Sequence, residues 1–273
     1  MLKDMLSPAA FFDLDACSHA DLFTGCYQVW QALAGLKTYV NRQIQDKEHS
    51  GMLLPRGTGI PLNRHLIVHE GRIIDDGEWE ISSGSIARGE LEVRGKDGLL
   101  AGASVIMAGA VLMGEGIMIG RGVLVEPGAL IKGPALIGDA SEIRQAAYMR
   151  GYCVIGRRCV VGHATEVKHS VFLDDAKAGH FAYLGDSILG QDVNLGAGTK
   201  CANLRFLPGN VMVTTDAGRV DSGLRKFGAI LGDRVQTGCN SVTSPGTVIG
   251  PDSLLMPNAT AASGVHSAKS LLR

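Results

Sequence analysis

Large aromatic side chains are scarce in this chain, since Phe, Trp and Tyr together make up 5% of its 273 residues. This scarcity argues against a core built on aromatic packing, and the 37 glycines suit tightly turning repeats instead. An excess of charge of either sign is also lacking, because 26 basic residues nearly balance 27 acidic ones. That balance gives no indication of a nucleic-acid or membrane partner. The apolar fraction of 45% is ample for a buried core.

Membrane and targeting segments are not indicated either. No apolar run reaches the ~18 residues that a membrane span needs, and no basic-then-apolar leader opens the chain. The six cysteines include no Cys-x-x-Cys pair, which argues against a structural zinc site and favours a reducing compartment. We therefore expect a cytoplasmic protein.

An aliphatic residue recurs at every sixth position through the middle of the chain, twelve times in succession. The series is Met107, Met113, Ile119, Val125, Ile131, Ile137, Ile143, Met149, Ile155, Val161, Val167 and Leu173. No α-helix repeats at six, whereas a fixed short period is typical of a solenoid, in which each repeat buries its apolar side against the coils above and below. The pattern therefore predicts a solenoid.

Each repeat has a second small position and a turn. The residue two positions before an anchor is small or β-branched, as at Ala147, Cys153 and Cys159, and glycine often follows the anchor. Glycine suits a turn because it accepts a positive φ without a steric clash. Three hexads would then make one triangular coil of three short strands.

The period slips after Leu173, since Leu184, Leu189 and Leu195 are spaced by five and six residues. Between Asn203 and Phe227 it is lost in a polar segment that contains glycine. A break of that length inside a solenoid predicts a loop that projects from one corner, and such loops usually carry function.

The first hundred residues differ from the repeat. Residues 20–40 carry apolar side chains at helical spacing, and we expect a helix that packs on the open end of the solenoid and covers its strand edges. Short strand-like runs over 64–100 are expected to form irregular first coils. The predicted organisation is a cap over 1–63, a solenoid over 64–265 with a loop at about 204–226, and a tail over 266–273.

The most specific motifs follow the slip. Residues 177–186 read Lys-Ala-Gly-His-Phe-Ala-Tyr-Leu-Gly-Asp, and residues 192–199 read Asp-Val-Asn-Leu-Gly-Ala-Gly-Thr. Together with the hexads, they resemble the hexapeptide-repeat acyltransferases, in particular the acetyltransferase domain of bifunctional N-acetylglucosamine-1-phosphate uridyltransferases, over roughly residues 100–260. The resemblance implies an all-β, left-handed parallel β-helix with acetyl-CoA as co-substrate and no metal. It also implies a sugar phosphate or nucleotide sugar as acceptor and a homotrimer with active sites between subunits.

The resemblance carries a set of site residues with it. His180 matches the catalytic base, Glu166 matches the carboxylate that orients this base, and Asn194 matches an asparagine that contacts the substrate. The residues that match the sugar-phosphate site are Arg150, Lys168, Tyr183, Asn203 and Lys226. Ala197 matches a backbone contact to acetyl-CoA, and Cys239 stands where the family has a serine near the cofactor.

Elementary chemistry supports part of this assignment. Lys132, Arg150 and Lys168 follow anchors at intervals of eighteen, so they are expected to stack on successive coils, where an anionic ligand would relieve their repulsion. A solvated surface row is the alternative. The imidazole of His180 can take a proton near neutral pH, and N–H groups of the Leu-Gly-Ala-Gly turn at 195–198 could stabilise the oxyanion that develops.

The chain also departs from the family. It has no Leu-x-x-Gly-x-Gly-Thr-Arg-like signature, so uridylyl transfer is not expected. The loop before Lys226 is longer than in the family, and Leu204 and Arg205 replace its Tyr-Asp pair. The family's basic tail is nearly absent, since the sequence stops at Arg273. These differences leave the acceptor sugar and the acyl donor open.

Two other functions compete with acyl transfer. A non-catalytic domain that binds sugar phosphates or serves in assembly would fit the altered loop and tail, but would not need His180, Asn194 and Lys226. A metal enzyme like the γ-type carbonic anhydrases would draw on His163, His169 and His180. Their intervals of six and eleven place these histidines on different corners, which argues against that reading.

Overall fold

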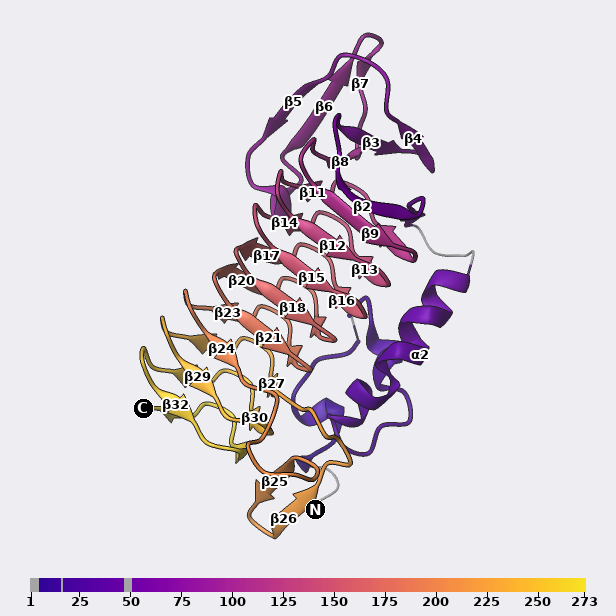
Figure 1. The fold of residues 1–273 in the computed structure, drawn as a ribbon. Coiled ribbons are helices and arrows are strands. Elements are labelled where there is room, and N and C mark those ends of the chain that lie inside the picture. The colour runs from indigo at the N-terminus through magenta and orange to yellow at the C-terminus, as the bar shows by residue number, and fades with distance from the viewer. Residues whose placement is uncertain (1–4, 16, 47–50) are drawn as a thin grey trace.

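The computed structural model describes residues 5–15, 17–46 and 51–273. Three long sheets run along the molecule and form the sides of a parallel β-helix (Figure 1). The chain passes from sheet C to sheet B to sheet A in each coil, so the corners between sheets recur in a fixed order. The parallel β-helix predicted from the hexads is confirmed.

The strands are distributed over the sheets as follows. Sheet A contains β1 (Met52–Leu53), β10 (Ile117–Ile119), β13 (Ala135–Ile137), β16 (Cys153–Ile155), β19 (Val171–Phe172), β22 (Ile188–Leu189), β27 (Ala229–Leu231), β30 (Thr247–Ile249) and β33 (Gly264–His266). Sheet B contains β2 (Gly57–Pro61), β9 (Val111–Gly114), β12 (Leu130–Lys132), β15 (Tyr148–Arg150), β18 (Glu166–Lys168), β21 (Tyr183–Gly185), β24 (Lys200–Cys201), β29 (Val242–Thr243) and β32 (Thr260–Ala261). Sheet C contains β4 (Arg72–Ile74), β3 (Leu66–His69), β8 (Ser104–Ile106), β11 (Leu124–Val125), β14 (Glu142–Ile143), β17 (Val160–His163), β20 (Lys177–His180), β23 (Asn194–Leu195), β28 (Gln236–Thr237), β31 (Leu254–Leu255) and β34 (Leu271–Leu272).

The core inside the coils is aliphatic, as the composition indicated. Nine of the twelve predicted anchors, from Ile119 to Val167, are buried in it, and Cys153 and Cys159 fill small inward positions. Three anchors were wrong: Met107, Met113 and Leu173 do not belong to this core. Their inward places are taken by the preceding residues, which are Ile106, Leu112 and Phe172. The hexad phase therefore holds only where the corners have equal lengths.

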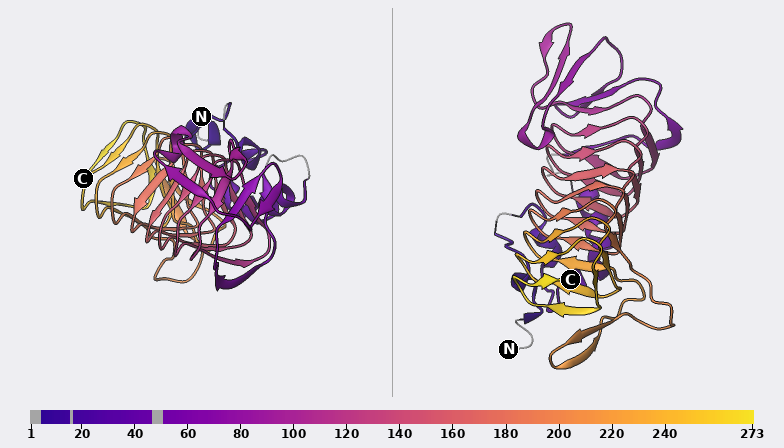
Figure 2. Two further views of the ribbon diagram at one scale, coloured as in Figure 1. Left: turned by 90° about the horizontal axis from the view of Figure 1, so that it is seen from above. Right: turned by 90° about the vertical axis from the view of Figure 1, so that its left-hand side faces the viewer.

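The N-terminal region differs from the prediction. Its long helix is α2 (Gln31–Gln45), preceded by the short 3-10 helices η1 (Pro8–Ala10) and η2 (Ala20–Phe23). Trp30, Leu33 and Leu36 pack with outward side chains of sheet A, such as Leu136 and Ile230. The helix thus lies along the side of the β-helix, not on its open end (Figures 1 and 2).

The first end of the β-helix is covered by strands. β1, β2 and β3 pair antiparallel with β10, β9 and β8, respectively, so each of the first parallel strands gains a partner. Beyond them lies a three-stranded sheet of β5 (Glu80–Ser83), β6 (Leu91–Gly95) and β7 (Gly98–Leu99), near the 3-10 helix η3 (Ile86–Arg88). Residues 64–100 are therefore antiparallel strands and not coils of the helix. No helix among the described residues is long and apolar enough to cross a membrane.

The predicted break is an insertion between β24 and β27. It contains the hairpin of β25 (Met212–Thr215) and β26 (Gly218–Asp221), which projects from the corner between sheets B and A (Figures 1 and 2). Strands that are neighbours across it, such as β22 and β27, pair Ile188 with Ile230, 42 residues apart (230 − 188). The β-helix therefore continues past the insertion without losing its register.

A buried carboxylate joins the N-terminal region to the coils. Asp174 accepts hydrogen bonds from the Ser18 hydroxyl (2.6 Å) and from the backbone N–H of Arg157 (2.8 Å), and its other oxygen pairs with the Arg157 guanidinium (2.7 Å). Burial raises the pKa of Asp174, but these hydrogen bonds and the charge of Arg157 outweigh that effect, and the pKa lies below its ordinary value.

We expect Asp174→Ala to loosen the N-terminal region from the β-helix, because the change leaves Ser18 and Arg157 without their shared acceptor. The free energy of unfolding should fall by about 1–3 kcal/mol, and limited proteolysis should cut residues 5–46 faster. Asp252→Ala is the control, since Asp252 forms a similar pair with Arg234 on the exposed surface. Equal effects of the two changes would contradict the anchoring role.

Candidate functional site

The outer face of sheet B carries two columns of polar side chains. Tyr148, Glu166 and Tyr183 are in register at the start of successive strands. Lys132 and Arg150 are in register at the end of β12 and β15, and Lys168 follows in the same column, paired in turn with Gly185. The predicted stacking of three cations is therefore correct, because the three residues are in register on neighbouring strands. Both columns lie on one face, since side chains two residues apart on a strand point to the same side of the sheet.

These cations are already neutralised in part. Arg150 Nη1 donates to Glu166 Oε1 (2.7 Å), and the ion pair raises the pKa of Arg150 further. Lys168 pairs with Asp186, with Nζ lying 2.9 Å from Oδ2. Lys132 is exposed. The repulsion that the sequence suggested is thus relieved within the chain for two of the three residues.

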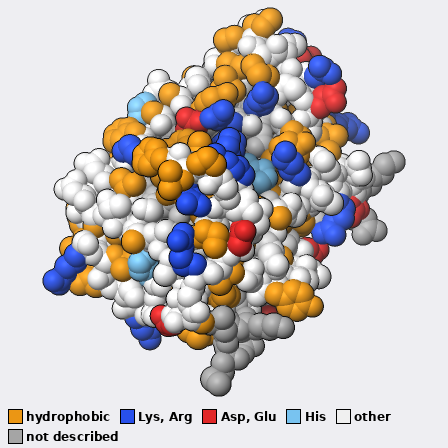
Figure 3. All heavy atoms as spheres, turned by 60° about the horizontal axis from the view of Figure 1, so that its bottom comes forward, with side chains coloured by type: hydrophobic (Ala, Val, Ile, Leu, Met, Phe, Trp, Pro, Cys, Tyr) orange, Lys and Arg blue, Asp and Glu red, His pale blue; other side chains and the backbone are white. Residues whose placement is uncertain are grey.

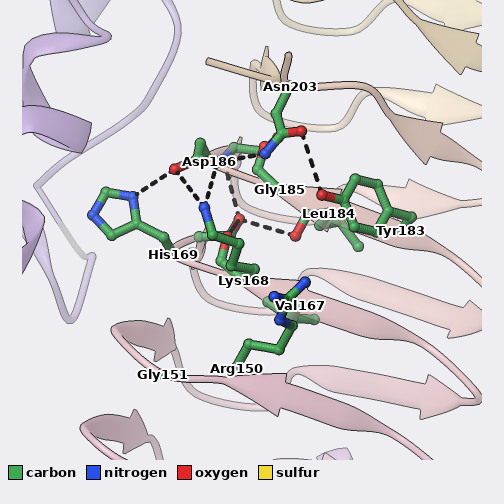
Figure 4. A network of polar contacts seen from close by, with 12 residues as sticks. Arg150, Gly151, Val167, Lys168, His169, Tyr183, Leu184, Gly185, Asp186 and Asn203 are labelled. Atoms are coloured by element: carbon green, nitrogen blue, oxygen red, sulfur yellow. Dashed lines mark hydrogen bonds and ion pairs between the residues drawn. The ribbon is translucent and has the colours of Figure 1, made fainter. Parts of the chain in front are cut away.

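Asp186 is the centre of a polar cluster at the corner between sheets B and A (Figure 4). Besides Lys168, it accepts a hydrogen bond from Asn203 Nδ2 (2.5 Å), and its Oδ1 lies 3.1 Å from His169 Nδ1. Tyr183 completes the group by donating its hydroxyl to Asn203 Oδ1 (3.3 Å). We call Lys168, His169, Tyr183, Asp186 and Asn203 the Asp186 cluster.

The cluster forms where the coil becomes shorter. Tyr148 pairs with Glu166, 18 residues on (166 − 148), whereas Val154 pairs with Val171, 17 residues on (171 − 154). The corner between sheets B and A is therefore one residue shorter in this coil. His169 occupies the turn that Gly151 and Tyr152 form in the preceding coil. His169 and Asp186 occupy equivalent corner positions in successive coils, both with φ of 48°. The tight turn brings the two side chains together.

Glycine at position 185 is required by the same packing. A Cβ there would collide with the Asn203 amide and would lie 2.6 Å from the Tyr183 hydroxyl oxygen. Because Gly185 occupies the column of Arg150 and Lys168, the row of long side chains ends at this point. The missing side chain makes room for Tyr183 and Asn203 to meet.

The charge on Asp186 is well stabilised. Burial raises its pKa, since the residue is 6% exposed, but hydrogen bonds from His169, Lys168 and Asn203 and the charge of Lys168 lower it by more. The pKa therefore lies below its ordinary value. At neutral pH the Asp186 cluster contains a carboxylate that holds an ammonium group and an amide in place.

Both ends of the insertion attach to this cluster. Asn203 lies where the chain leaves the β-helix to form the insertion. At the other end of the insertion, the backbone N–H of Phe227 donates to the carbonyl oxygen of Asn203 (2.9 Å). The N–H of Gly228 donates to the carbonyl oxygen of Asp186 (2.8 Å). Lys226, which immediately precedes Phe227, is therefore held near Asn203, as the assignment of both residues to one site requires.

His180 lies at a different corner, between sheets C and B. It is exposed at the end of β20 and is in register with His163 of β17. The N–H of Gly198 donates to the carbonyl oxygen of His180 (3.0 Å), and that of Asn240 donates to Ala197 (2.8 Å). His163, His180, Ala197 and Cys239 thus stack on successive coils, and we call them the histidine corner.

Neither of the other two predicted catalytic residues forms a hydrogen bond with His180 among the described residues. Glu166 begins β18 on sheet B and pairs with Arg150, so its orienting role toward His180 stays a prediction. Asn194 is exposed at the start of β23 and is in register with Lys177, at the far end of β20 from His180. Asp186 and the histidine corner accordingly occupy opposite borders of sheet B, whereas Tyr183 begins β21 on the side of the histidine corner.

The turn at 195–198 offers one candidate donor for an oxyanion. The N–H of Gly196 donates to Thr237 (2.9 Å), and that of Gly198 donates to His180, so both are used by the β-helix. The N–H of Ala197 has no acceptor among the described residues. Of these three N–H groups, only that of Ala197 is therefore available to an oxyanion. The resemblance had matched Ala197 to a backbone contact with acetyl-CoA.

The three histidines considered as metal ligands are divided between corners. His163 and His180 are stacked at the histidine corner, whereas His169 faces Asp186 at the other border of sheet B. Across residues 5–15, 17–46 and 51–273, no group of three or more His, Cys, Asp or Glu side chains could hold a metal ion. Within one chain, this geometry gives the carbonic-anhydrase alternative no support.

Sequence analysis missed the residues that organise the cluster. Asp186 and Gly185 lay within the Tyr-Leu-Gly-Asp motif and were given no role, and His169 was considered only as a metal ligand. The available signal was the shortening of the period from eighteen to seventeen, which puts His169 and Asp186 on equivalent turns. Their contact depends on side-chain directions that the period does not contain.

The Asp186 cluster should make stability depend on acid. Because the pKa of Asp186 is lowered by folding, the carboxylate stabilises the fold above its unfolded pKa of about 4, and this contribution is lost as the pH falls through the folded value. Asp186→Asn should therefore lower the free energy of unfolding by about 1–3 kcal/mol at pH 7, and by less at pH 3.

Chemical denaturation at both pH values measures this difference. Asp97→Asn is the control, since Asp97 is exposed and forms no ion pair with a described residue. The free energy of unfolding of Asp186→Asn is compared with that of the unchanged protein at each pH. If this difference were the same at pH 7 and pH 3, the charge of Asp186 would not be what stabilises the cluster.

A comparison with known families matches the part of the chain that contains these residues. The family model described as the GMPPB C-terminal domain matches residues 131–252. These residues run from β12 to the coil before β31 and include every predicted site residue.

Curated relatives match a shorter stretch. The chain is 46% identical over 94 residues to a bifunctional sugar-1-phosphate nucleotidylyltransferase/acetyltransferase of Sulfurisphaera tokodaii, which covers 34% of this chain and 23% of that protein. It is 45% identical over 93 residues to the bifunctional protein GlmU of Methanococcus maripaludis, covering 34% of this chain and 22% of the relative. The matched stretch thus spans less than a quarter of either relative.

Among solved structures, a UDP-N-acetylglucosamine acyltransferase of Francisella novicida matches with a TM-score of 0.29 and 15% identity, over 58% of this chain and 60% of that one. That likeness is too weak to support an argument. The sequence matches confirm the resemblance that the motifs predicted: over about a third of its length, this chain resembles bifunctional sugar-1-phosphate nucleotidylyltransferase/acetyltransferase proteins.

Proposed function

We propose that this chain is an acyl-CoA-dependent acyltransferase, with acetyl-CoA as donor, that acts on a phosphorylated or nucleotide-linked amino sugar. One observation carries the proposal: the matched residues other than Asn194 lie along sheet B and its two borders, with an exposed imidazole at one border and stabilised cations and an amide at the other. Such an arrangement combines a base with an anion-binding surface, as transfer to a sugar phosphate requires.

His180 is the general base in this proposal. Its exposed imidazole removes a proton from the attacking amine or hydroxyl of the sugar while that group attacks the thioester carbonyl. The N–H of Ala197, on the next coil, stabilises the oxyanion of the tetrahedral intermediate. When this intermediate collapses, the C–S bond breaks, and the leaving coenzyme A thiolate takes the proton that His180 removed from the acceptor. Glu166 and Asn194 orient the base and the acceptor once the site is assembled. Cys239 lies one coil further along the histidine corner, beside the path of the donor.

The Asp186 cluster holds the sugar phosphate. Lys168 and Lys226 supply positive charge, and Tyr183 and Asn203 supply hydroxyl and amide donors. Arg150 stands in the column next to Lys168 and presents a guanidinium group that suits phosphate. The role of Asp186 is to fix Lys168 and Asn203 before the ligand arrives, which lowers the entropic cost of binding.

The separation of the two borders supports a homotrimer. Within one chain, His180 precedes β21 and Asp186 follows it, so a second copy could place its histidine corner against the first chain's Asp186. The N-terminal region covers sheet A, which leaves sheets B and C for this contact. We also propose a cytoplasmic location, because all six cysteines are free thiols.

A non-catalytic sugar-phosphate-binding domain is the second candidate. The observation that favours it is the ion pair between Glu166 and Arg150, which leaves His180 without a carboxylate partner among the described residues. A protein of this kind would bind sugar phosphates at the Asp186 cluster and release no thiol.

Thiol release from acetyl-CoA tests the proposal, with glucosamine 1-phosphate and a panel of amino-sugar phosphates as acceptors. We expect release that requires an acceptor and falls about 10²–10⁴-fold in His180→Ala. His266→Ala serves as the control, since His266 lies on β33 away from sheet B. Acceptor binding without thiol release would favour the non-catalytic candidate, and equal losses in the two histidine variants would refute the role of His180.

A further inference from the structure

An open cavity lies beside the insertion, next to the Asp186 cluster. Its volume is about 400 Å³, and it lies between the arm at residues 204–207, the hairpin of β25 and β26, and the corner that follows β29. Leu204, the residue after Asn203, lines one end of it. The cavity therefore begins where the predicted sugar-phosphate site ends.

The direction of the cavity follows from the coil register. Ser244, one coil beyond Asn203, and Ser263, two coils beyond, both line it. Because strands in a sheet lie about 4.8 Å apart, the cavity extends roughly 10 Å along the helix axis from the level of Asn203. A ligand that occupied both places would be longer than a sugar phosphate.

The walls of this cavity carry positive charge. Residues 204–226 contain four cationic side chains (Arg205, Arg219, Arg225 and Lys226) and two carboxylates (Asp216 and Asp221), whereas the whole chain has a net charge of −1. Arg205 and Arg219 line the cavity. Arg205 Nη1 donates to the carbonyl oxygen of Asn210 (2.5 Å), and Arg219 forms no ion pair with a described residue. Guanidinium groups so placed favour an anion, and phosphate above all.

The other part of the lining is apolar. Leu207 and Met212 form it together with Phe206, whose side chain is fully exposed at 105%. Viewed from this end of the molecule, basic side chains lie beside hydrophobic ones (Figure 3). An exposed aromatic ring next to arginine is suited to stacking a planar heterocycle, which every nucleobase provides.

We propose that this cavity binds a nucleoside diphosphate, with the base against Phe206 and the phosphates between Arg205 and Arg219. The acceptor is then a nucleotide-linked sugar: its sugar lies at the Asp186 cluster, and its nucleotide extends beneath the insertion. The statement about the acceptor rests on the proposed acyltransferase function, whereas binding of the nucleotide does not require turnover. Leu204 and Arg205, which replace the family's Tyr-Asp pair, mark the beginning of this added site.

Calorimetric titration of the full chain with uridine 5′-diphosphate tests the inference, with inorganic pyrophosphate as a second probe. We expect the nucleotide to bind more tightly than pyrophosphate. Arg219→Ala should weaken both ligands about tenfold or more. Phe206→Ala should weaken the nucleotide about tenfold and leave pyrophosphate unchanged, because only the nucleotide has a base to stack.

Two variants serve as controls. Arg72→Ala removes an exposed arginine at the other end of the molecule, and Tyr27→Ala removes an aromatic side chain that is 72% exposed. Both should leave nucleotide binding unchanged. Failure of the nucleotide to bind at millimolar concentration, or equal losses in Arg72→Ala and Arg219→Ala, would overturn the inference. Displacement of the nucleotide by coenzyme A, with the same dependence on Arg219, would assign the cavity to the donor and overturn it as well.

Thiol release separates this inference from the proposed function. Release with glucosamine 1-phosphate that needs His180, without nucleotide binding, would refute the added site alone. Nucleotide binding that needs Arg219, without thiol release from any acceptor, would refute the acyltransferase and leave the added site in place. If both proposals hold, Arg219→Ala lowers thiol release with a nucleotide-linked amino sugar as acceptor. The same change leaves thiol release with the sugar 1-phosphate unchanged.

Discussion

Parallel hydrogen bonding between successive coils is the constraint on which the rest of this structure depends. Each strand inside the stack has a partner one coil above and one below, so a side chain on one coil lies about 4.8 Å from its equivalents on the next. The aliphatic core, the columns on sheet B and the histidine corner are all results of this stacking. Residues distant in sequence become neighbours without long-range packing of a globular kind. Even the insertion leaves the register unchanged, because it departs and returns at one corner.

The candidate site arises where this regularity is modified. Loss of one residue at His169 tightens a corner and brings His169 and Asp186 together, and Gly185 leaves space for Tyr183 and Asn203. Asp186 then joins three coils through Lys168, Asn203 and Gly228. Under the proposed function, stability and ligand binding depend on the same carboxylate. The insertion adds surface next to this point and does not disturb it.

Much of the fold could be predicted because the period is a direct consequence of stacking. The anchors from Ile119 to Val167 were right because all corners between them have equal lengths. Leu173 was wrong because the corner at His169 is one residue shorter, a change that a sixfold count cannot place. The position of α2 could not be predicted, because its apolar stripe indicates burial but does not say that the partner is the outer face of sheet A.

The site could be predicted less completely than the fold. The column of Lys132, Arg150 and Lys168 followed from spacing, but their carboxylate partners did not, since these come from other coils and depend on side-chain direction. The corner of His180 could not be calculated across the slip, and the register with His163 now supplies it. The motif identified Tyr183, Asn194 and Asn203 as a group, whereas the coordinates separate Asn194 from the other two.

The structure of the chain with glucosamine 1-phosphate bound is the measurement that tests this account most directly. We predict that the phosphate lies against Lys168, with the sugar between Tyr183 and Asn203 on the outer face of sheet B and its amine directed toward a histidine corner. A ligand bound elsewhere on the molecule, with the Asp186 cluster unoccupied at saturating concentration, would contradict the claim that the shortened corner of the β-helix builds the site.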